Sequence, residues 1–340
     1  MTGKKVLRWI VQNRMLVILL LLLTILTLKT DKFWTLRNLQ FLLEAMSING
    51  VMVVGMTVVM IGAGLDLSIG SIMAMCGIIV VSLMKSIGLP AAIVVAVLAG
   101  AFFGAMNGFF ITKLRINPFI ATLGTMITVR GLAMTITDGH PVAISHVLFS
   151  EIGRGKVMGF PIPGIIFLVV VLLGIFFLRY TITGRNVYAY GGNEEAARAS
   201  GIQINQVKMV SYILSGLTAG ISGVVLASRL STGSPVIGED TSLAVITAVL
   251  LGGTSLSGGV GTIGGSLIGL LSVSVLSNGM NLLNIPAYYQ RVAMGALLLF
   301  VIIVDSLYTR SRRRALSRTR GKQQDKLTGH AAETKITSLT

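Results

Sequence analysis

The sequence has little charge, one cysteine and few histidines. Only 12% of its 340 residues are charged and 53% are apolar, whereas ordinary soluble domains carry roughly 25% charged residues. Its mean hydropathy is +0.84. These figures exclude a water-soluble globule and a disordered chain, and the 40 glycines exclude a coiled coil. Cys76 stands alone in an apolar run, which favours a buried bystander over a redox or metal-ligating residue.

The motifs of the common enzyme classes are missing as well. The histidines are His140, His146 and His330, none of which falls in an apolar segment, so no membrane segment carries a histidine cluster for a metal. No GxxxxGK[ST] phosphate loop is present, because the many glycines lie within apolar runs without the required lysine. We therefore expect this chain not to be an enzyme, to hydrolyse no ATP and to bind no cofactor or metal.

What the sequence has in abundance is long apolar segments. Crossing about 30 Å of hydrocarbon takes a helix of roughly 20 mostly apolar residues, because lipid offers the backbone no hydrogen-bond partners. The sequence thus predicts an all-α, polytopic membrane bundle of about ten helices. The predicted spans lie near 10–28, 45–62, 69–87, 90–112, 117–137, 162–180, 208–229, 241–254, 262–283 and 287–306. The first lacks a small-residue cleavage site, so we interpret it as an anchor and not as a signal peptide.

Positive charge is placed unevenly along the chain, whose formal net charge is +16. Lysine and arginine gather at the N-terminus, between some of the spans and in the tail, in the stretches 1–14, 113–115, 179–208 and 307–340. The positive-inside rule places these stretches and both termini in the cytoplasm. Lys29, Lys32 and Arg37 form the one local exception. The net charge thus indicates orientation in a membrane and no nucleic-acid partner.

The charge pattern also divides the chain. We expect a cytoplasmic N-terminal segment over 1–9, a transmembrane domain over 10–306 and a basic cytoplasmic tail over 307–340. The tail changes abruptly to polar and basic residues, so we expect it to be disordered and to lie against anionic lipid.

Two interruptions of the apolar pattern resemble each other. GAGLDLSIGSI (62–72) and GGTSLSGGVGTI (252–263) each follow an apolar run, pass through Gly, Ser and Leu, and lead into another. This likeness suggests an internal repeat with broken helices, a recurrent feature of transporters. Asp66 in the first interruption has two interpretations: an N-cap that accepts from backbone amides of the following helix, or a role in gating or subunit contact.

Other polar side chains lie within the spans. Arg130 stands toward the outer end of its span near Asp138, so it either reaches the interface or a structural partner, or contacts solute. Buried amides pose a similar choice between bridging helices and lining a pathway. The candidate pathway or gating residues are Asp66, Ser68, Asn107, Arg130, Asn278 and Asn281. Glycines at four-residue spacing, including Gly100 and Gly216 in different spans, predict close packing of helices.

The longest cytoplasmic interruption, 181–207, reads TITGRNVYAYGGNEEAARASGIQINQV. Asn193 can cap the strong helix formers that follow it, and Gly201 stands where a C′ glycine ends a helix. A short amphipathic helix lying across the cytoplasmic face is therefore predicted here.

The same segment resembles a known family. Glu195-Ala196-Ala197, followed by three residues and Gly201, is similar to the EAA-type loop of bacterial ABC importer permeases. Further blocks extend this likeness: GMTVVMIGAGLDLSIGS, PFIATLGTMITVRG, GRNVYAYGGNEEAARASGI, AVLLGGTSLSGGVGTIGGSLIG and NGMNLL. Together they resemble the ribose-type sugar permeases of that superfamily, from about residue 35 to 306.

The resemblance implies that residues 10–306 form a permease domain in a bacterial inner membrane. It also implies a pore between two permease copies, or a close pair, that works by alternating access. A cytoplasmic ABC ATPase, which binds ATP and Mg²⁺, would receive the loop helix in a groove, and a periplasmic sugar-binding protein would deliver the solute. The candidate ATPase-coupling residues are Asn193, Glu194, Glu195, Ala196, Ala197 and Gly201. Alanine permits close approach, the carboxylates can meet basic residues, and the glycine lets the chain turn back. The alternative is a solvated amphipathic linker.

The sequence leaves other functions open. The same architecture carries nucleosides, autoinducer-like sugars or branched-chain amino acids in similar permeases. A secondary transporter driven by an ion gradient is a further alternative, but such transporters use carboxylates within the membrane. Asp66, Asp138 and Asp305 fall at span ends, and Glu239 and Asp240 precede a span, so no mid-span acid is predicted.

Overall fold

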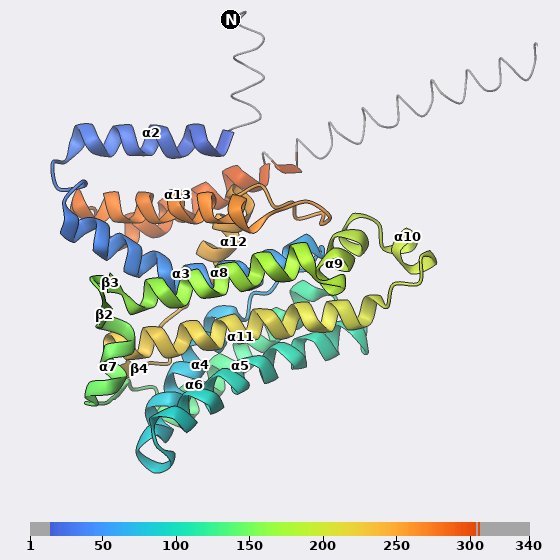
Figure 1. Cartoon of the computed structure of the whole chain (residues 1–340), viewed down its shortest axis with the longest axis horizontal. Coiled ribbons are helices and arrows are strands. Elements are labelled where there is room, and N and C mark those ends of the chain that lie inside the picture. The colour runs from blue at the N-terminus through green and yellow to red at the C-terminus, as the bar shows by residue number, and fades with distance from the viewer. Residues whose placement is uncertain (1–13, 304, 307–340) are drawn as a thin grey trace, which may run out of the picture. The chain divides into compact units, whose positions relative to one another are not determined.

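The computed structural model describes residues 14–303 and 305–306 (Figure 1). The chain divides into two units, of which the first ends at Gly295 and the second begins at Ala296. The first unit contains every element from α2 to α13. The predicted segments 1–9 and 307–340 and the start of the first predicted span lie outside the described residues.

Seven helices in the described part are long and apolar enough to cross a membrane. They are α3 (Leu36–Ile61), α4 (Ile69–Ile87), α5 (Leu89–Thr112), α6 (Pro118–Thr137), α8 (Ile162–Tyr180), α11 (Ile204–Leu230) and α13 (Ile263–Leu282). The predicted polytopic helical membrane protein is confirmed, although the count of ten spans is not. Three predicted spans correspond to shorter apolar helices: Leu19–Lys29 within α2 (Arg14–Lys29), α12 (Thr241–Leu251) and Ala287–Ile303. At 1.5 Å per residue, α12 is about half the length that hydrocarbon requires.

The remaining elements are short. They are α7 (Val147–Arg154), α9 (Ile182–Gly192), α10 (Glu194–Ala199) and two antiparallel pairs of two-residue strands, β1 (Val142–Ala143) with β4 (Thr232–Gly233) and β2 (Lys156–Val157) with β3 (Phe160–Pro161). The pairing of β1 with β4 connects the segment after α6 to the end of α11.

Helix α11 packs against α3, α4 and α5 and runs beside α5 in Figure 1. The predicted glycine contact is confirmed at this interface. A Cβ added to Gly216 would overlap the carbonyl oxygen of Gly100, and one added to Gly100 would overlap the carbonyl oxygen of Gly216. In lipid, where no hydrophobic force draws helices together, such close backbone approach supplies the van der Waals contact that holds them.

Replacing Gly216 with valine should therefore destabilise the bundle by about 1–3 kcal/mol, because the two backbones must separate. Differential scanning fluorimetry of the purified protein in detergent measures the effect. Gly124 on α6 is the matched control, since an added Cβ there meets nothing within 4 Å. Equal melting temperatures for Gly216→Val and Gly124→Val would show that the contact is unimportant.

The two predicted interruptions end their helices in the same way. After α3, the Ala63 N–H donates to the Met60 carbonyl (2.9 Å) and the Gly64 N–H to the Val59 carbonyl (3.0 Å). After α12, the Gly253 N–H donates to the Leu250 carbonyl (2.9 Å) and the Thr254 N–H to the Val249 carbonyl (3.2 Å). Both are Schellman motifs.

The residue that follows the C-cap has a positive φ in both motifs, 55° at Ala63 and 84° at Gly253. The first break thus spans residues 62–68 and the second 252–262, each followed by a membrane-length helix. The same motif also ends α10 and α13, so the shared termination agrees with the internal repeat that the sequence suggests but is not specific to it.

Candidate functional site

The predicted short helix is present as α10, which begins after Asn193 and ends before Ser200. The Asn193 Oδ1 accepts from the Ala196 N–H (3.0 Å), which satisfies one of the free donors at the helix start. Gly201 has a φ of 81°, and its N–H donates to the Arg198 carbonyl (3.0 Å). The N–H of Ile202 donates to the Ala197 carbonyl (3.1 Å), which completes a third Schellman motif.

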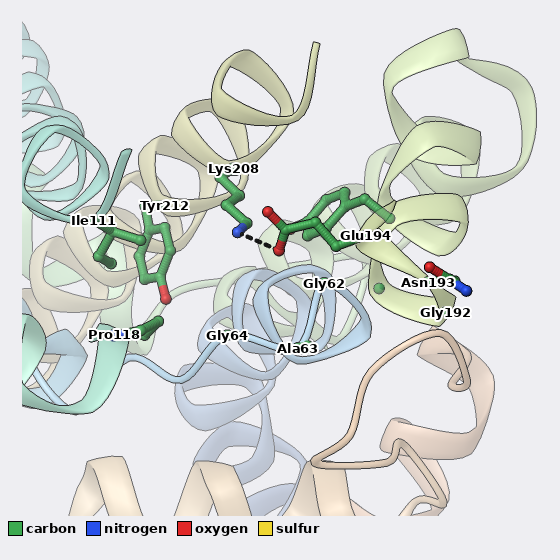
Figure 2. A pocket seen from close by; sticks show the side chains of 12 residues that line it. Gly62, Ala63, Gly64, Ile111, Pro118, Gly192, Asn193, Glu194, Lys208 and Tyr212 are labelled. Carbon is green, nitrogen blue, oxygen red and sulfur yellow. Dashed lines mark hydrogen bonds and ion pairs between the residues drawn. The ribbon is translucent and has the colours of Figure 1, made fainter. Parts of the chain in front are cut away.

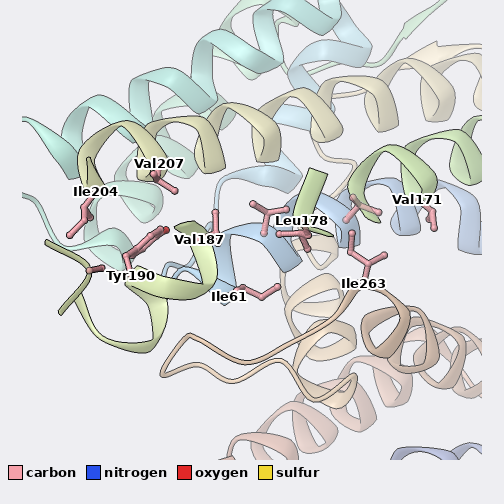
Figure 3. Packing of buried hydrophobic residues seen from close by; sticks show 11 residues of the cluster. Ile61, Val171, Leu178, Val187, Tyr190, Ile204, Val207 and Ile263 are labelled. Carbon is pink, nitrogen blue, oxygen red and sulfur yellow. The ribbon is translucent and has the colours of Figure 1, made fainter. Parts of the chain in front are cut away.

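The predicted coupling residues divide into two groups by exposure. Asn193, Glu194, Glu195, Ala196 and Gly201 are exposed, whereas Ala197 is buried. Ala197 belongs to an apolar cluster that includes residues of α9 and α11 (Figure 3). Its side chain therefore packs inside this chain and is not available for direct contact with a partner. The exposed residues form one short surface that a partner could reach.

Glu194 already has partners of its own. Its carboxylate forms ion pairs with Lys208 at 2.9 Å and with Arg198 at 3.1 Å (Figure 2). The hydrogen bond from Lys208, the main cause, lowers the pKa of Glu194 below its usual range; partial burial opposes this, and Arg198 adds to it. Glu194 thus joins α10 to the second turn of α11. In the described residues no ion pair involves Glu195, so it is the carboxylate placed to meet a basic partner.

Because the pKa of Glu194 is lowered on folding, its ion pair should hold α10 in place above pH 4.5 and release it as the pH falls through the lowered pKa. A spin label at the exposed Ser200 should therefore become more mobile in acid. Glu194→Gln should show the mobile spectrum already at neutral pH. A spectrum that is independent of both pH and this substitution would contradict the role of the pair.

Two cavities flank the Glu194–Lys208 pair. One, of about 190 Å³, is lined by the start of the first break, by the end of α9 and by Tyr212 (Figure 2). The other, of about 520 Å³, lies between the α5–α6 connection and the α10–α11 segment and includes Arg115 and Arg198. The ion pair thus separates a small cavity at the helix break from a larger polar groove.

Three of the predicted gating residues meet in one buried network. Asp66 Oδ1 accepts from the Ser68 N–H (3.0 Å) and from the Ser68 hydroxyl (2.6 Å), and Asp66 Oδ2 accepts from the Ser215 hydroxyl (2.7 Å). Asn107 Nδ2 donates to the Ser68 oxygen (2.8 Å). All four side chains are fully buried. The network joins the first break to α5 and α11.

This arrangement corrects one of the two interpretations of Asp66. The N-cap position of α4 is occupied by Ser68, and Asp66 bonds the N–H of Ser68 itself, so Asp66 is not the N-cap of that helix. Although it lies between two helices in sequence, Asp66 is fully enclosed by protein. Sequence reasoning missed Ser215, because a serine beside a packing glycine carries no pattern that distinguishes it.

The other candidates lie elsewhere. Arg130 Nη1 donates to the carbonyls of Pro235 and Ile237, the latter at 2.8 Å, so its structural partners are these backbone groups and not the nearby Asp138. Asp138 instead ends α6 in the left-handed conformation. Arg130 therefore holds the segment before α12 against α6.

The two asparagines of α13 bridge elements, which is one of the two predicted interpretations. Asn278 exchanges hydrogen bonds with Asn38 of α3 at 2.8 and 3.0 Å, and Asn281 accepts from Gln290 at 2.8 Å. Neither belongs to the Asp66 network in the described structure.

The structure has the features of a polytopic permease. These are apolar helices of membrane length, two helix breaks with the same termination and a short, capped, exposed helix before α11. The chain belongs to the family described as "Branched-chain amino acid transport system / permease component", which matches residues 38–302.

Individual relatives agree over most of the chain. The ribose import permease protein RbsC of Escherichia coli K12 is 39% identical over 88% of this chain and 94% of the relative. RbsC of Bacillus subtilis 168 is 41% identical over 84% of this chain and 90% of the relative. The L-arabinose ABC transporter permease protein AraH of Azospirillum brasilense is 39% identical over 91% of each. No solved structure matches the chain.

Proposed function

We propose that this chain is the permease subunit of an ATP-driven, binding-protein-dependent importer of a ribose-like monosaccharide in the inner membrane. The observation that carries the proposal is its similarity to ribose and L-arabinose permeases over nearly their whole length. These relatives are about equally similar to it, so the proposal names a class of monosaccharide and not one sugar.

The partners follow from that assignment. A cytoplasmic ABC ATPase binds ATP and Mg²⁺ and contacts the exposed surface of α10, chiefly at Glu195 and Ala196. A periplasmic sugar-binding protein delivers solute to the opposite face, and a second permease copy or a paralogue completes the pore. Both termini then lie in the cytoplasm, as the distribution of basic residues indicates.

The mechanism that this supports is alternating access. Closure of the paired ATPases moves the α10 helices, and the helix bundle shifts so that the pore opens to the other side. Asp66, Ser68 and Asn107 are proposed to hold the first break in a defined conformation. Because all three are fully buried and hydrogen-bonded to protein, we assign them positioning and not contact with solute.

Transport assays test the cargo. Deletion of the gene should lower uptake of radiolabelled ribose or L-arabinose by about tenfold or more, and the wild-type gene should restore it, while leucine uptake stays unchanged. Loss of leucine uptake with normal sugar uptake would instead support branched-chain amino acid import, which the family description names.

The energy source is tested separately. In proteoliposomes that contain the assembled complex, uptake should require ATP inside and should survive a protonophore. Uptake that collapses with the protonophore and continues without ATP would indicate an ion-coupled secondary transporter.

A further inference from the structure

Helix α9, which leads into α10, lies directly against both helix breaks. At the first break, an added Cβ on Gly62 would overlap the hydroxyl of the buried Tyr190. A Cβ on Gly191 would overlap the Ile61 carbonyl oxygen and would come within 2.8 Å of the Gly259 nitrogen in the second break. The end of α9 therefore fits between the two breaks with no room for a further carbon.

Hydrogen bonds join these three segments. The Gly259 N–H donates to the Ile61 carbonyl (2.7 Å), so the second break is tied to the last residue of α3. The Tyr188 hydroxyl donates to the Gly261 carbonyl (2.9 Å), so α9 is tied to the second break. Gly259 and Gly261 both have a positive φ, which makes this loop dependent on its contacts for its conformation.

Tyr190 also connects α9 to α10. The Lys208 ammonium lies 5.7 Å from the centre of the Tyr190 ring and pairs with Glu194 of α10. Tyr190 and Ala197 share one apolar cluster (Figure 3). Displacement of α10 therefore acts on Tyr190 through a charged contact and an apolar contact at once.

The first break leads on to the buried network. The Tyr212 hydroxyl donates to the Leu65 carbonyl (3.2 Å), and the next residue, Asp66, bonds Ser215 on the same helix. A shift of the first break is thus passed to the interface of α11 with α5, where Gly216 lies against Gly100.

We propose that α9 transmits the movement of α10 to both helix breaks, and that Tyr190 at the first break and Tyr188 at the second are the positioning residues for this transmission. The inference rests on the proposed ATP-driven import. It assigns α9 a mechanical role in the transport cycle: the two breaks move together because they are hydrogen-bonded to each other through Gly259 and Ile61, and the end of α9 packs against both.

The test uses the full complex of permease, ATPase and binding protein in proteoliposomes, with sugar uptake and ATP hydrolysis measured on the same preparation. Tyr190→Ala and Tyr188→Phe should leave ATPase co-purification intact and hydrolysis within about twofold of wild type. The ratio of sugar imported to ATP hydrolysed should fall about tenfold for Tyr190→Ala and two- to fivefold for Tyr188→Phe.

Two further variants serve as controls. Tyr190→Phe, which keeps the ring against Gly62 and Lys208, should retain most of the wild-type ratio. Tyr180→Ala is the matched control, since this tyrosine is exposed at the end of α8.

A second measurement follows the movement itself. Spin labels at Ser200 near α10 and at Ser257 in the second break, both exposed, should report a change of distance on ATP binding. Tyr188→Phe should reduce that change, which decides the question even if Tyr190→Ala does not assemble. An unaltered transport ratio and an unaltered distance change in an intact complex would overturn the role of α9. If the wild-type chain binds no ATPase or imports sugar without one, the proposed function itself fails.

Discussion

Uptake by the assembled importer should fall about tenfold when Gly201 is replaced by valine, while the protein still inserts and folds. Gly201 ends α10 at a φ of 81°, a conformation that costs a β-branched residue about 1–2 kcal/mol. An added Cβ there meets nothing within 4 Å, so the substitution acts on the backbone alone. Because 1.4 kcal/mol corresponds to a factor of ten, the ratio of correctly ended to frayed helix should fall by about that factor.

The matched control is Gly201→Asn, because asparagine tolerates the left-handed region and should retain most of the uptake. Glu195→Trp is a complementary variant that leaves the backbone as it is but enlarges the exposed surface of α10. We expect it to uncouple uptake from ATP hydrolysis without changing the melting temperature. Equal uptake in Gly201→Val, Gly201→Asn and wild type would refute the importance of the helix end.

Replacing Asp66 with alanine should abolish uptake and lower the stability of the protein by about 3 kcal/mol or more. The carboxylate accepts three hydrogen bonds in a fully buried site, so its removal leaves Ser68 and Ser215 without their acceptor. The unpartnered Oδ1 of Asn107 can accept from the Ser68 hydroxyl if the amide turns, which replaces only one of the three lost hydrogen bonds. The melting temperature in detergent and sugar uptake in cells measure the two effects.

Asp66→Asn should be milder, since the amide oxygen still accepts from Ser68 and the Ser215 hydroxyl can turn to accept from the new NH₂ group. Asp138→Asn controls for loss of a carboxylate outside the buried network, at a left-handed position that asparagine favours. If Asp66→Ala melts at the temperature of Asp138→Asn, the network does not hold the first break.

Features decided by neighbours in the sequence could be predicted from the sequence. Asn193 and Gly201 bound α10 because a cap and a left-handed glycine act on backbone groups within one turn. The long apolar runs became membrane-length helices because their backbones have no other partner in lipid. The likeness of the two breaks was visible as Gly-Ser-Leu patterns, and it corresponds to two helix ends with the same hydrogen bonds.

Features decided by which helices meet could not be predicted. Asp66 and Ser215 are 149 residues apart and bond only because α11 packs beside the first break in one register. Arg130 contacts carbonyls more than 100 residues away, so its nearest acid in sequence was a poor guide. Ala197 was expected on a partner surface, yet its face of α10 turns toward α9 and α11.

The sequence by itself therefore determined a helical membrane protein of the permease class, with a capped helix between α9 and α11 and two related breaks. Only the tertiary structure decided that α9 lies between those breaks, that Glu194 is paired with Lys208 and that Asp66 is enclosed. The reason is physical. Helix caps and hydropathy depend on residues that are close along the chain. Contacts between helices depend on how closely two backbones can approach and on the register in which they pack, and both involve residues far apart in the sequence.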